Sequence, residues 1–163
     1  MSRTGMVILE QDHDRFVAIL EELTRETNAR LAFLLAKSGQ TIARHGDLDG
    51  VDQTSLASLT AGNVAATEGL VHLMGEAQFC TLFHEGQQDS LHITLISNKV
   101  ILLVIFDEHS SLGLVRLRVG QYAPRLKSVV DEILKRGDNA GETAAAELSL
   151  GDLSDEDIDA LFA

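Results

Sequence analysis

The sequence predicts an α/β domain of the α+β kind, with a five-stranded antiparallel sheet, one long helix on one face and two helices on the other. Two runs, at 30–36 and 100–106, are continuously apolar, so both faces of these strands should be covered and both should be central. More polar runs at 40–44 and 79–85 should be edges. The five expected strands are 30–36, 40–44, 79–85, 90–97 and 100–106.

Three segments with helical spacing of apolar residues provide the covering layers. The first is expected over 14–26, with Asp12 as its cap and Asn28 at its end. Its inner face carries Phe16, Leu20 and Leu23. The second begins at a cap on Asp52 or Thr54 and ends at Gly75. The third spans 112–136, with Val115, Val119, Leu126, Val129, Val130 and Ile133 inward. Pro124 predicts that it is either bent or divided into two abutting helices.

The long middle helix carries two stripes of different character. The bulky apolar stripe is expected to face the sheet and consists of Leu56, Leu59, Ala66, Leu70, Leu73 and Met74. About 120° away lies a stripe of small residues: Ser58, Gly62, Ala65, Gly69 and His72. Two mid-helix glycines cost about 2 kcal/mol relative to alanine. We interpret this stripe as a surface that a dimer mate or a partner protein approaches closely. The alternative is close packing on the helix's own sheet.

Composition excludes several classes of function. The net charge of −12 repels phosphate, and an aromatic content of 4% without tryptophan offers little surface for stacking bases, so we expect no nucleic-acid binding. No apolar run is long enough to span a membrane, and the first residues lack a signal-type core, which predicts a soluble, cytoplasmic protein. The single Cys80 fits a reducing compartment.

No catalytic motif is present in the sequence. The patterns GxxxxGK[ST], GxSxG, HExxH, CxxC and GxGxxG are all missing, so we expect no enzyme activity and no cofactor. His84 and His92 lie on neighbouring expected strands, and we interpret them as ordinary strand histidines in preference to a metal site. The acidic loop over 47–52 lacks the glycine and glutamate positions of a calcium loop, so we interpret it as solvated.

Two strings carry a resemblance to a known family. Residues 55–67 (SLASLTAGNVAAT) and 111–118 (SLGLVRLR) resemble the Roadblock/LC7 family, and within it the MglB-type proteins that pair with a Ras-like GTPase in bacterial polarity systems. The resemblance covers about residues 6–136, with further similarity at 153–162. It implies a Roadblock/LC7 domain over 1–137 with the fold described above. The sequence therefore divides into this domain and a tail over 138–163.

The resemblance also implies a function. It implies a homodimer whose paired long helices form a platform for one Ras-like small GTPase of the MglA type, and stimulation of GTP hydrolysis by that GTPase. It further implies a role in cell polarity or motility, with a cell pole as a candidate location in the cytoplasm. A non-catalytic Roadblock scaffold or docking subunit is the alternative.

The expected platform has no arginine finger to offer. Residues 51–98 contain no Lys or Arg, so any activation must reposition groups that the GTPase already owns. Four arginines elsewhere are the candidates to consider, and we interpret them as solvated charges: Arg30 and Arg44, which should lie nearest the central sheet, and Arg116 and Arg118 on the last helix.

The tail differs from the domain in charge. Residues 138–163 hold eight acids and no base, which leaves a net charge of −4 for residues 1–137. Its first part is expected to be a flexible linker that reaches ~20–25 Å. Ser154 can cap a short amphipathic helix near 154–162, whose apolar face is Ile158, Leu161 and Phe162. We predict that this face docks on the GTPase. Disorder that only promotes solubility is the alternative.

Overall fold

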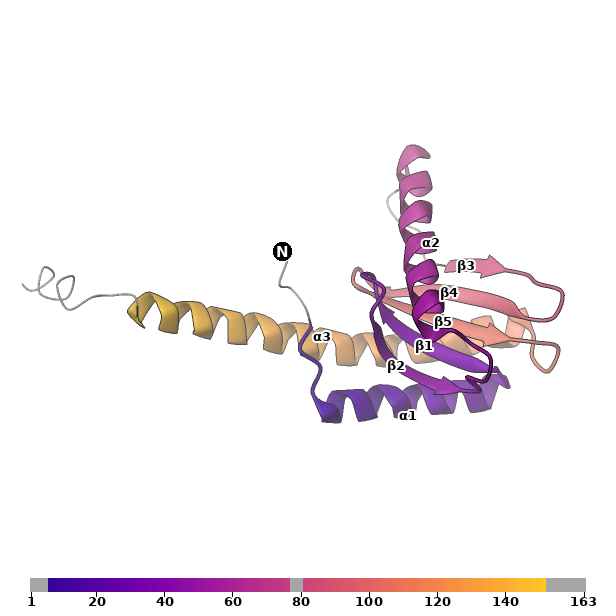
Figure 1. Cartoon of the computed structure of the whole chain (residues 1–163), viewed down its shortest axis with the longest axis horizontal. Coiled ribbons are helices and arrows are strands. Elements are labelled where there is room, and N and C mark those ends of the chain that lie inside the picture. Colours follow the sequence, from indigo (N-terminus) through magenta and orange to yellow (C-terminus); the bar gives the residue numbers. More distant parts are fainter. Residues whose placement is uncertain (1–5, 77–80, 152–163) are drawn as a thin grey trace, which may run out of the picture. The chain divides into compact units, whose positions relative to one another are not determined.

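The computed structural model describes residues 6–76 and 81–151. They form two compact units: Leu9–Val130, and a smaller unit that joins residues before Leu9 to residues from Asp131 onward. Figure 1 shows the elements in chain order. These are α1 (Glu10–Thr27), β1 (Leu31–Ala36), β2 (Thr41–Gly46), α2 (Gln53–Leu73), β3 (Thr81–His84), β4 (Ser90–Ser97), β5 (Val100–Phe106) and α3 (Leu112–Gly151).

The five strands form one antiparallel sheet in the order β2-β1-β5-β4-β3. The two continuously apolar strands, β1 and β5, are therefore central or next to the centre, and the polar β2 and β3 are the edges. This confirms the expected fold class and the expected edges. Strands β4 and β5 have the predicted bounds. Phe79 and Cys80, at the predicted start of β3, lie outside the described residues.

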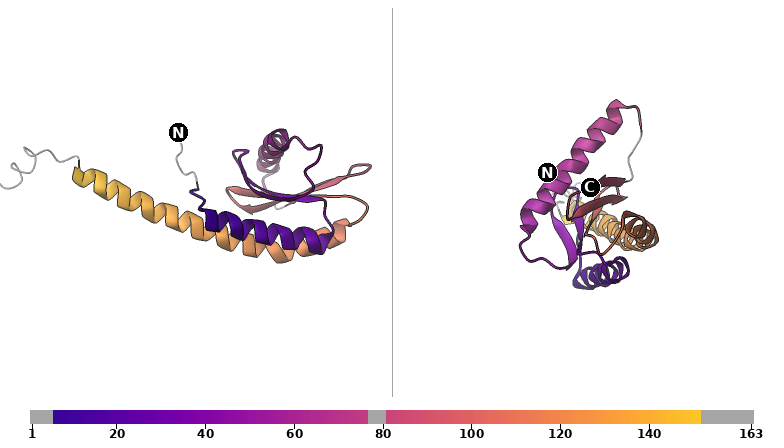
Figure 2. Two further views of the ribbon diagram at one scale, coloured as in Figure 1. Left: turned by 60° about the horizontal axis from the view of Figure 1, so that its bottom comes forward. Right: turned by 90° about the vertical axis from the view of Figure 1, so that its right-hand side faces the viewer.

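Both faces of β1 and β5 are buried along almost their whole length, which explains why these two strands are apolar at every position. One face packs against α2 and contains Leu31, Phe33, Leu35, Ile93, Ile101, Leu103 and Ile105. The alternate residues, such as Leu34 and Leu102, are also fully buried and point to the opposite face. Figure 2 shows α1 and the first part of α3 side by side on that opposite face, with α2 on the first. The predicted arrangement of one helix against two is thus confirmed.

Helix α1 starts earlier than the sequence predicted. Leu9 is its N-cap, and Asp12 lies three residues inside, where its carboxylate accepts the Leu9 N–H at 2.9 Å. The prediction of Asp12 as the cap is therefore wrong, because the carboxylate serves the helix start from within the first turn. The predicted end is confirmed: Asn28 adopts the left-handed conformation, with φ of 53°.

Helix α3 continues well past its predicted end. It begins at Leu112 as expected, runs uninterrupted through Pro124 and ends at Gly151. The prediction of two abutting helices is wrong. The predicted flexible linker from Gly137 to Asp152 is helical as far as Gly151, so that prediction is wrong over these residues. The tail segment 154–162, including Ile158, Leu161 and Phe162, lies outside the described residues. No helix among the described residues combines the length and the apolar content needed to cross a membrane.

Candidate functional site

Helix α2 faces the sheet with residues that the sequence analysis did not select. Its buried residues are Ala57, Thr60, Ala61 and Val64. Leu56 is only partly buried against the same core. The prediction that the bulky stripe faces the sheet is therefore wrong for all its large residues except Leu56. The helix meets the sheet through a third stripe, and its small side chains allow the helix axis to lie close to the strands.

The bulky stripe points into solvent. Leu59, Leu70, Leu73 and Met74 are respectively 73%, 60%, 84% and 76% exposed, and Ala66 is exposed as well. Soluble monomers rarely expose contiguous apolar patches of this kind outside interaction sites. Four large apolar residues on one helix are therefore a candidate surface for contact with another protein. We call this set the bulky face.

The stripe of small residues is exposed too. Ser58, Gly62, Ala65, Gly69 and His72 all lie on the surface of the described chain. A Cβ atom built at Gly62 or Gly69 would meet nothing within 4 Å, so neither glycine is needed for packing on the sheet. The alternative that these residues serve internal packing is therefore excluded for both glycines. We call this set the small face.

A few polar contacts hold α2 in place. Asp52 caps its start, where the carboxylate accepts the Ser55 hydroxyl at 2.8 Å and the Ser55 N–H at 3.2 Å. These two hydrogen bonds, the side-chain bond first, lower the pKa of Asp52. Farther along, Glu68 forms an ion pair with Lys37 of the β1–β2 turn. No buried residue follows Val64 in α2, and Figure 1 shows the C-terminal half of the helix standing clear of the sheet.

The two strand histidines do not meet. Phe83 lies directly opposite His92, so their side chains share a face, and His84 points to the other face. His84 Nε2 lies 2.9 Å from the Asn63 amide nitrogen of α2, which links β3 to the helix. His92 is buried, its Nδ1 lies 3.2 Å from the Thr94 hydroxyl, and its Nε2 has no hydrogen-bond partner. The two side chains therefore lie on opposite faces of the sheet and belong to different local environments.

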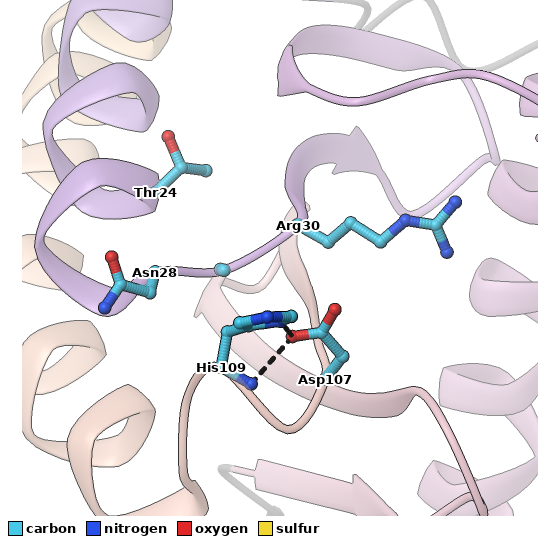
Figure 3. Close-up of a pocket in the computed structure, with 6 residues that line it drawn as sticks. Thr24, Asn28, Arg30, Asp107 and His109 are labelled. Carbon is cyan, nitrogen blue, oxygen red and sulfur yellow. Dashed lines mark hydrogen bonds and ion pairs between the residues drawn. The ribbon is translucent and has the colours of Figure 1, made fainter.

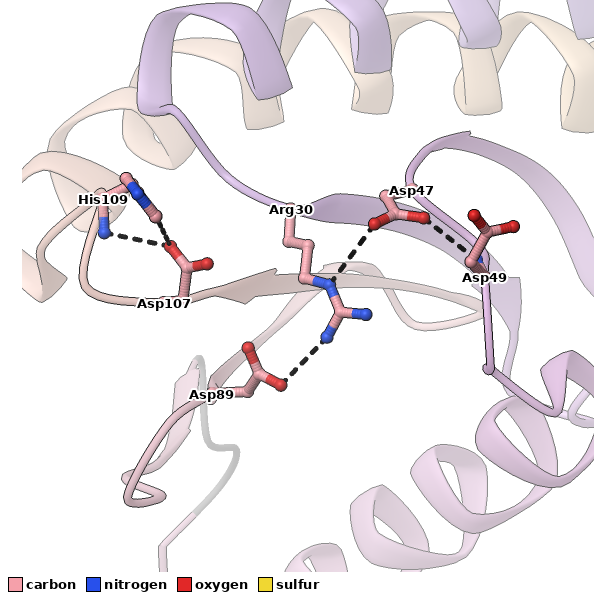
Figure 4. A network of polar contacts seen from close by, with 6 residues as sticks. All are labelled: Arg30, Asp47, Asp49, Asp89, Asp107 and His109. Carbon is pink, nitrogen blue, oxygen red and sulfur yellow. Dashed lines mark hydrogen bonds and ion pairs between the residues drawn. The ribbon is translucent and has the colours of Figure 1, made fainter.

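The four arginines named from the sequence have different surroundings. Arg30 Nη1 lies 3.0 Å from Asp89 and its Nε lies 3.8 Å from Asp47, so one guanidinium connects two loops (Figure 4). Gly46, with φ of 125°, passes so close to Arg30 that a Cβ there would lie 2.4 Å from the Arg30 carbonyl oxygen.

The other three arginines lie on β2 and α3. Arg118 contacts Glu26 of α1 at 3.6 Å. Arg44 and Arg116 are exposed. None of the four lies on α2, which carries both exposed faces.

Comparison with protein families identifies the domain that contains α2 and the sheet. The model of the Roadblock/LC7 domain matches residues 16–106, from the first turns of α1 to the end of β5. The chain belongs to the Roadblock/LC7 family. The family match contains the whole of α2 and the sheet beneath it, so both exposed faces lie on the Roadblock/LC7 domain itself. Comparison with curated proteins gave no match.

Within this family, the chain is similar to solved structures of MglB proteins. The chain is 45% identical to Myxococcus xanthus MglB, with a TM-score of 0.74, covering 78% of this chain and 96% of that one. It is 34% identical to the gliding protein MglB from Thermus thermophilus, with a TM-score of 0.73, covering 78% of this chain and 97% of that one. It is also 33% identical to an MglB described with a tetrameric arrangement, with a TM-score of 0.75, covering 79% and 97%. The predicted resemblance is confirmed.

Proposed function

We propose that this Roadblock/LC7 chain is a homodimeric regulator that binds a Ras-like small GTPase of the MglA type and stimulates its GTP hydrolysis. One observation carries the proposal: the chain matches almost the full length of MglB structures at 33–45% identity. The role would lie in cell polarity or motility, in the cytoplasm and at a cell pole.

The bulky face of α2 supports the homodimer. Leu59, Leu70, Leu73 and Met74 are exposed in a single chain, and a second copy would cover them. Burying one leucine or methionine side chain stabilises an interface by about 1.5–3 kcal/mol. A solved structure of a similar chain, described as MglB with a tetrameric arrangement, is in keeping with self-assembly. In a symmetric dimer the same residues would contact their counterparts, as an isologous interface requires.

The small face is the proposed contact for the GTPase. Gly62, Ala65 and Gly69 leave no side chain beyond a methyl group on the exposed helix surface, and Ser58 and His72 add polar ends. A partner can therefore approach the backbone of α2 closely. The two faces point in different directions around the helix, so one copy of α2 can meet a dimer mate and a GTPase at the same time.

The proposed mechanism uses the residues of the GTPase. Helix α2 and strands β3 and β4 contain neither Lys nor Arg, so the proposed contact has no cation to insert into the active site of a partner. Stimulation would come from holding the catalytic groups of the GTPase in their reactive positions. The protein itself would then carry out no catalysis and would need no cofactor.

Single-turnover GTP hydrolysis by the Ras-like GTPase of the same cell tests the proposal. The expected result is a faster rate in the presence of this protein, together with complex formation. Binding without any change in rate would instead support the non-catalytic scaffold. Absence of both binding and stimulation would contradict both functions.

Alanine substitutions at Arg30, Arg44, Arg116 and Arg118 test the absence of a finger. Loss of a true arginine finger lowers the stimulated rate by about 10³-fold or more. We expect each variant to lose far less, provided that the complex still forms. A variant that binds normally but stimulates hardly at all would identify that arginine as a finger.

A further inference from the structure

A pocket of about 530 Å³ lies on the larger unit, away from α2. It is lined by Thr24, Asn28, Ala29, Arg30, Asp107 and His109, which come from the end of α1, the start of β1 and the loop after β5 (Figure 3). No residue of either exposed face of α2 lines it. The pocket is therefore a second candidate site, independent of the proposed GTPase contact.

The cation that lines this pocket is already neutralised. Figure 3 shows the Arg30 guanidinium directed away from Asn28 and His109. Figure 4 shows it between Asp47 and Asp89, the two carboxylates with which it forms ion pairs. One positive charge thus faces two negative charges outside the pocket. Asp107, which lines the pocket, has His109 as its charged or polar side-chain partner and no Lys or Arg partner among the described contacts.

Asp107 remains an anion near neutral pH. Its Oδ1 accepts the His109 N–H and lies 2.9 Å from His109 Nδ1. The backbone bond first, and then the bond from the ring, lower the pKa of Asp107. The C-terminal end of α1 adds partial negative charge, since the last carbonyl groups of a helix concentrate the negative end of its dipole.

Asp107 and His109 offer hydrogen-bond acceptors to the pocket. An ionised carboxylate can only accept, so His109 Nδ1 carries the hydrogen of the bond to Asp107. In the neutral ring, Nε2 then holds a lone pair and is a second acceptor. The second oxygen of the Asp107 carboxylate adds a further acceptor position. A ligand for this pocket should therefore be positively charged and rich in N–H groups.

The side chains around the pocket favour an organic cation over a metal ion as its ligand. Among residues 6–76 and 81–151, no three His, Cys, Asp or Glu side chains gather closely enough to hold a metal. A guanidinium group, in contrast, has five N–H donors in a plane and prefers carboxylate and carbonyl oxygens. We propose that this pocket binds an arginine side chain presented by a partner protein, with Asp107 as its anchoring anion.

Titration by ¹H–¹⁵N NMR with N-acetyl-arginine methylamide tests this site on the full-length protein. N-acetyl-citrulline methylamide is the control ligand, because it has nearly the same shape and no charge. We expect saturable shifts of amides in residues 24–30 and 107–110 with the arginine compound alone. Asp107→Asn should weaken this binding at least about fivefold, because a neutral amide replaces the anion while still accepting the His109 N–H.

Asp49→Asn is the matched control variant, because it removes the same charge from an exposed residue outside the pocket lining. It should change the affinity by no more than about twofold, as expected for a screened surface charge. If both variants lose the same affinity for the arginine compound, the binding comes from general attraction to an acidic protein, and the proposal is overturned. Equal shifts with citrulline, or no saturable shift, would overturn it as well. Neither result depends on whether α2 binds a GTPase.

Discussion

Ala65 and Gly69 show most directly how single residues define the proposed GTPase contact. Both are exposed, and a side chain at Gly69 would have open space around it in the folded chain. We expect Ala65→Arg or Gly69→Arg to abolish binding of the GTP-loaded partner, because a long charged group would be trapped at a close contact. The cost should be several kcal/mol of binding, on the order of 3 or more. A binding titration measures it.

The matched control at the same position is Gly69→Ala. Alanine stabilises a helix interior by about 1 kcal/mol relative to glycine, and its methyl group adds little bulk to the surface. We expect this variant to bind the GTPase nearly as well as the parent and to unfold at a slightly higher denaturant concentration. Unchanged affinity of the arginine variants would exclude the small face as the contact.

His92 makes the stability of the fold depend on pH. Burial first, and then the positive charge of Arg116, lower the pKa of His92 from its ordinary value of 6.5. As the pH falls below this value, the unfolded chain takes up the proton before the folded chain does. The stabilising contribution is therefore complete above about pH 6.5 and is lost as the pH falls toward the lowered pKa of the folded state.

The substitution His92→Leu should remove this part of the pH dependence. Urea unfolding at pH 8 and at pH 5.5 gives the loss of stability on acidification for each protein. We expect a larger loss for the parent than for the variant, since carboxyl groups contribute to both and cancel in the comparison. If both proteins lose the same free energy of unfolding between pH 8 and pH 5.5, His92 makes no contribution to the pH dependence of stability.

At the scale of elements, the sheet was predictable and the rotation of α2 was not. Continuous apolar runs identified β1 and β5 because burial on both faces leaves no polar position. Helical periodicity, in contrast, shows only that α2 has distinct stripes. We assigned the largest apolar residues to the sheet, as in a monomeric protein. The close packing through Ala57 and Ala61 instead leaves those large residues outside.

The bulky face of α2 therefore yields a prediction about assembly. Leu73→Asp or Leu70→Asp should convert a dimer to a folded monomer, because each introduces a charge into the proposed interface and removes a leucine worth about 1.5–3 kcal/mol. Light scattering at micromolar concentration measures the mass, and circular dichroism checks the fold. Leu117→Asp on α3 is the control, since Leu117 is also exposed but lies outside this face. A mass that is unchanged in the α2 variants would place the dimer contact elsewhere.

The end of α3 shows where local sequence rules were insufficient. Gly137 and Gly141, with the acids around them, indicated a linker, yet the helix passes through both to Gly151. The pocket beside Asp107 was also missed, because its residues lie about 80 positions apart in the chain and share no motif. Long-range proximity of that kind becomes visible only in the folded chain.

At the scale of the whole molecule, the helical end of α3 changes how the tail should act. Residues 137–151 form a helical segment about 22 Å long at the usual rise per residue, in place of the coil predicted from composition. We still expect deletion of residues 148–163 to weaken binding of the GTPase, and to do so more at low salt, because the tail is acidic and electrostatic attraction is screened by ions.

A shorter deletion of residues 152–163 separates two contributions. It removes the segment with Ile158, Leu161 and Phe162 and keeps the whole of α3. If the segment 152–163 docks on the GTPase, both deletions should weaken binding equally. Titrations at two salt concentrations measure this. If the truncated proteins bind and stimulate the GTPase as well as the full chain does at both salt concentrations, the tail serves only to keep the protein soluble.

The absence of Lys and Arg from α2 to β4 also determines which chemical methods can detect an interface there. Trypsin cannot cut between Arg44 and Lys99, so α2, β3 and β4 leave a digest together in one peptide that begins at His45. Amine-reactive cross-linkers have no lysine to modify on α2, and a cross-linking map would be blank at the proposed contact even in a saturated complex. Reagents that couple carboxylates can instead reach this helix through Glu68 and the adjoining Glu76.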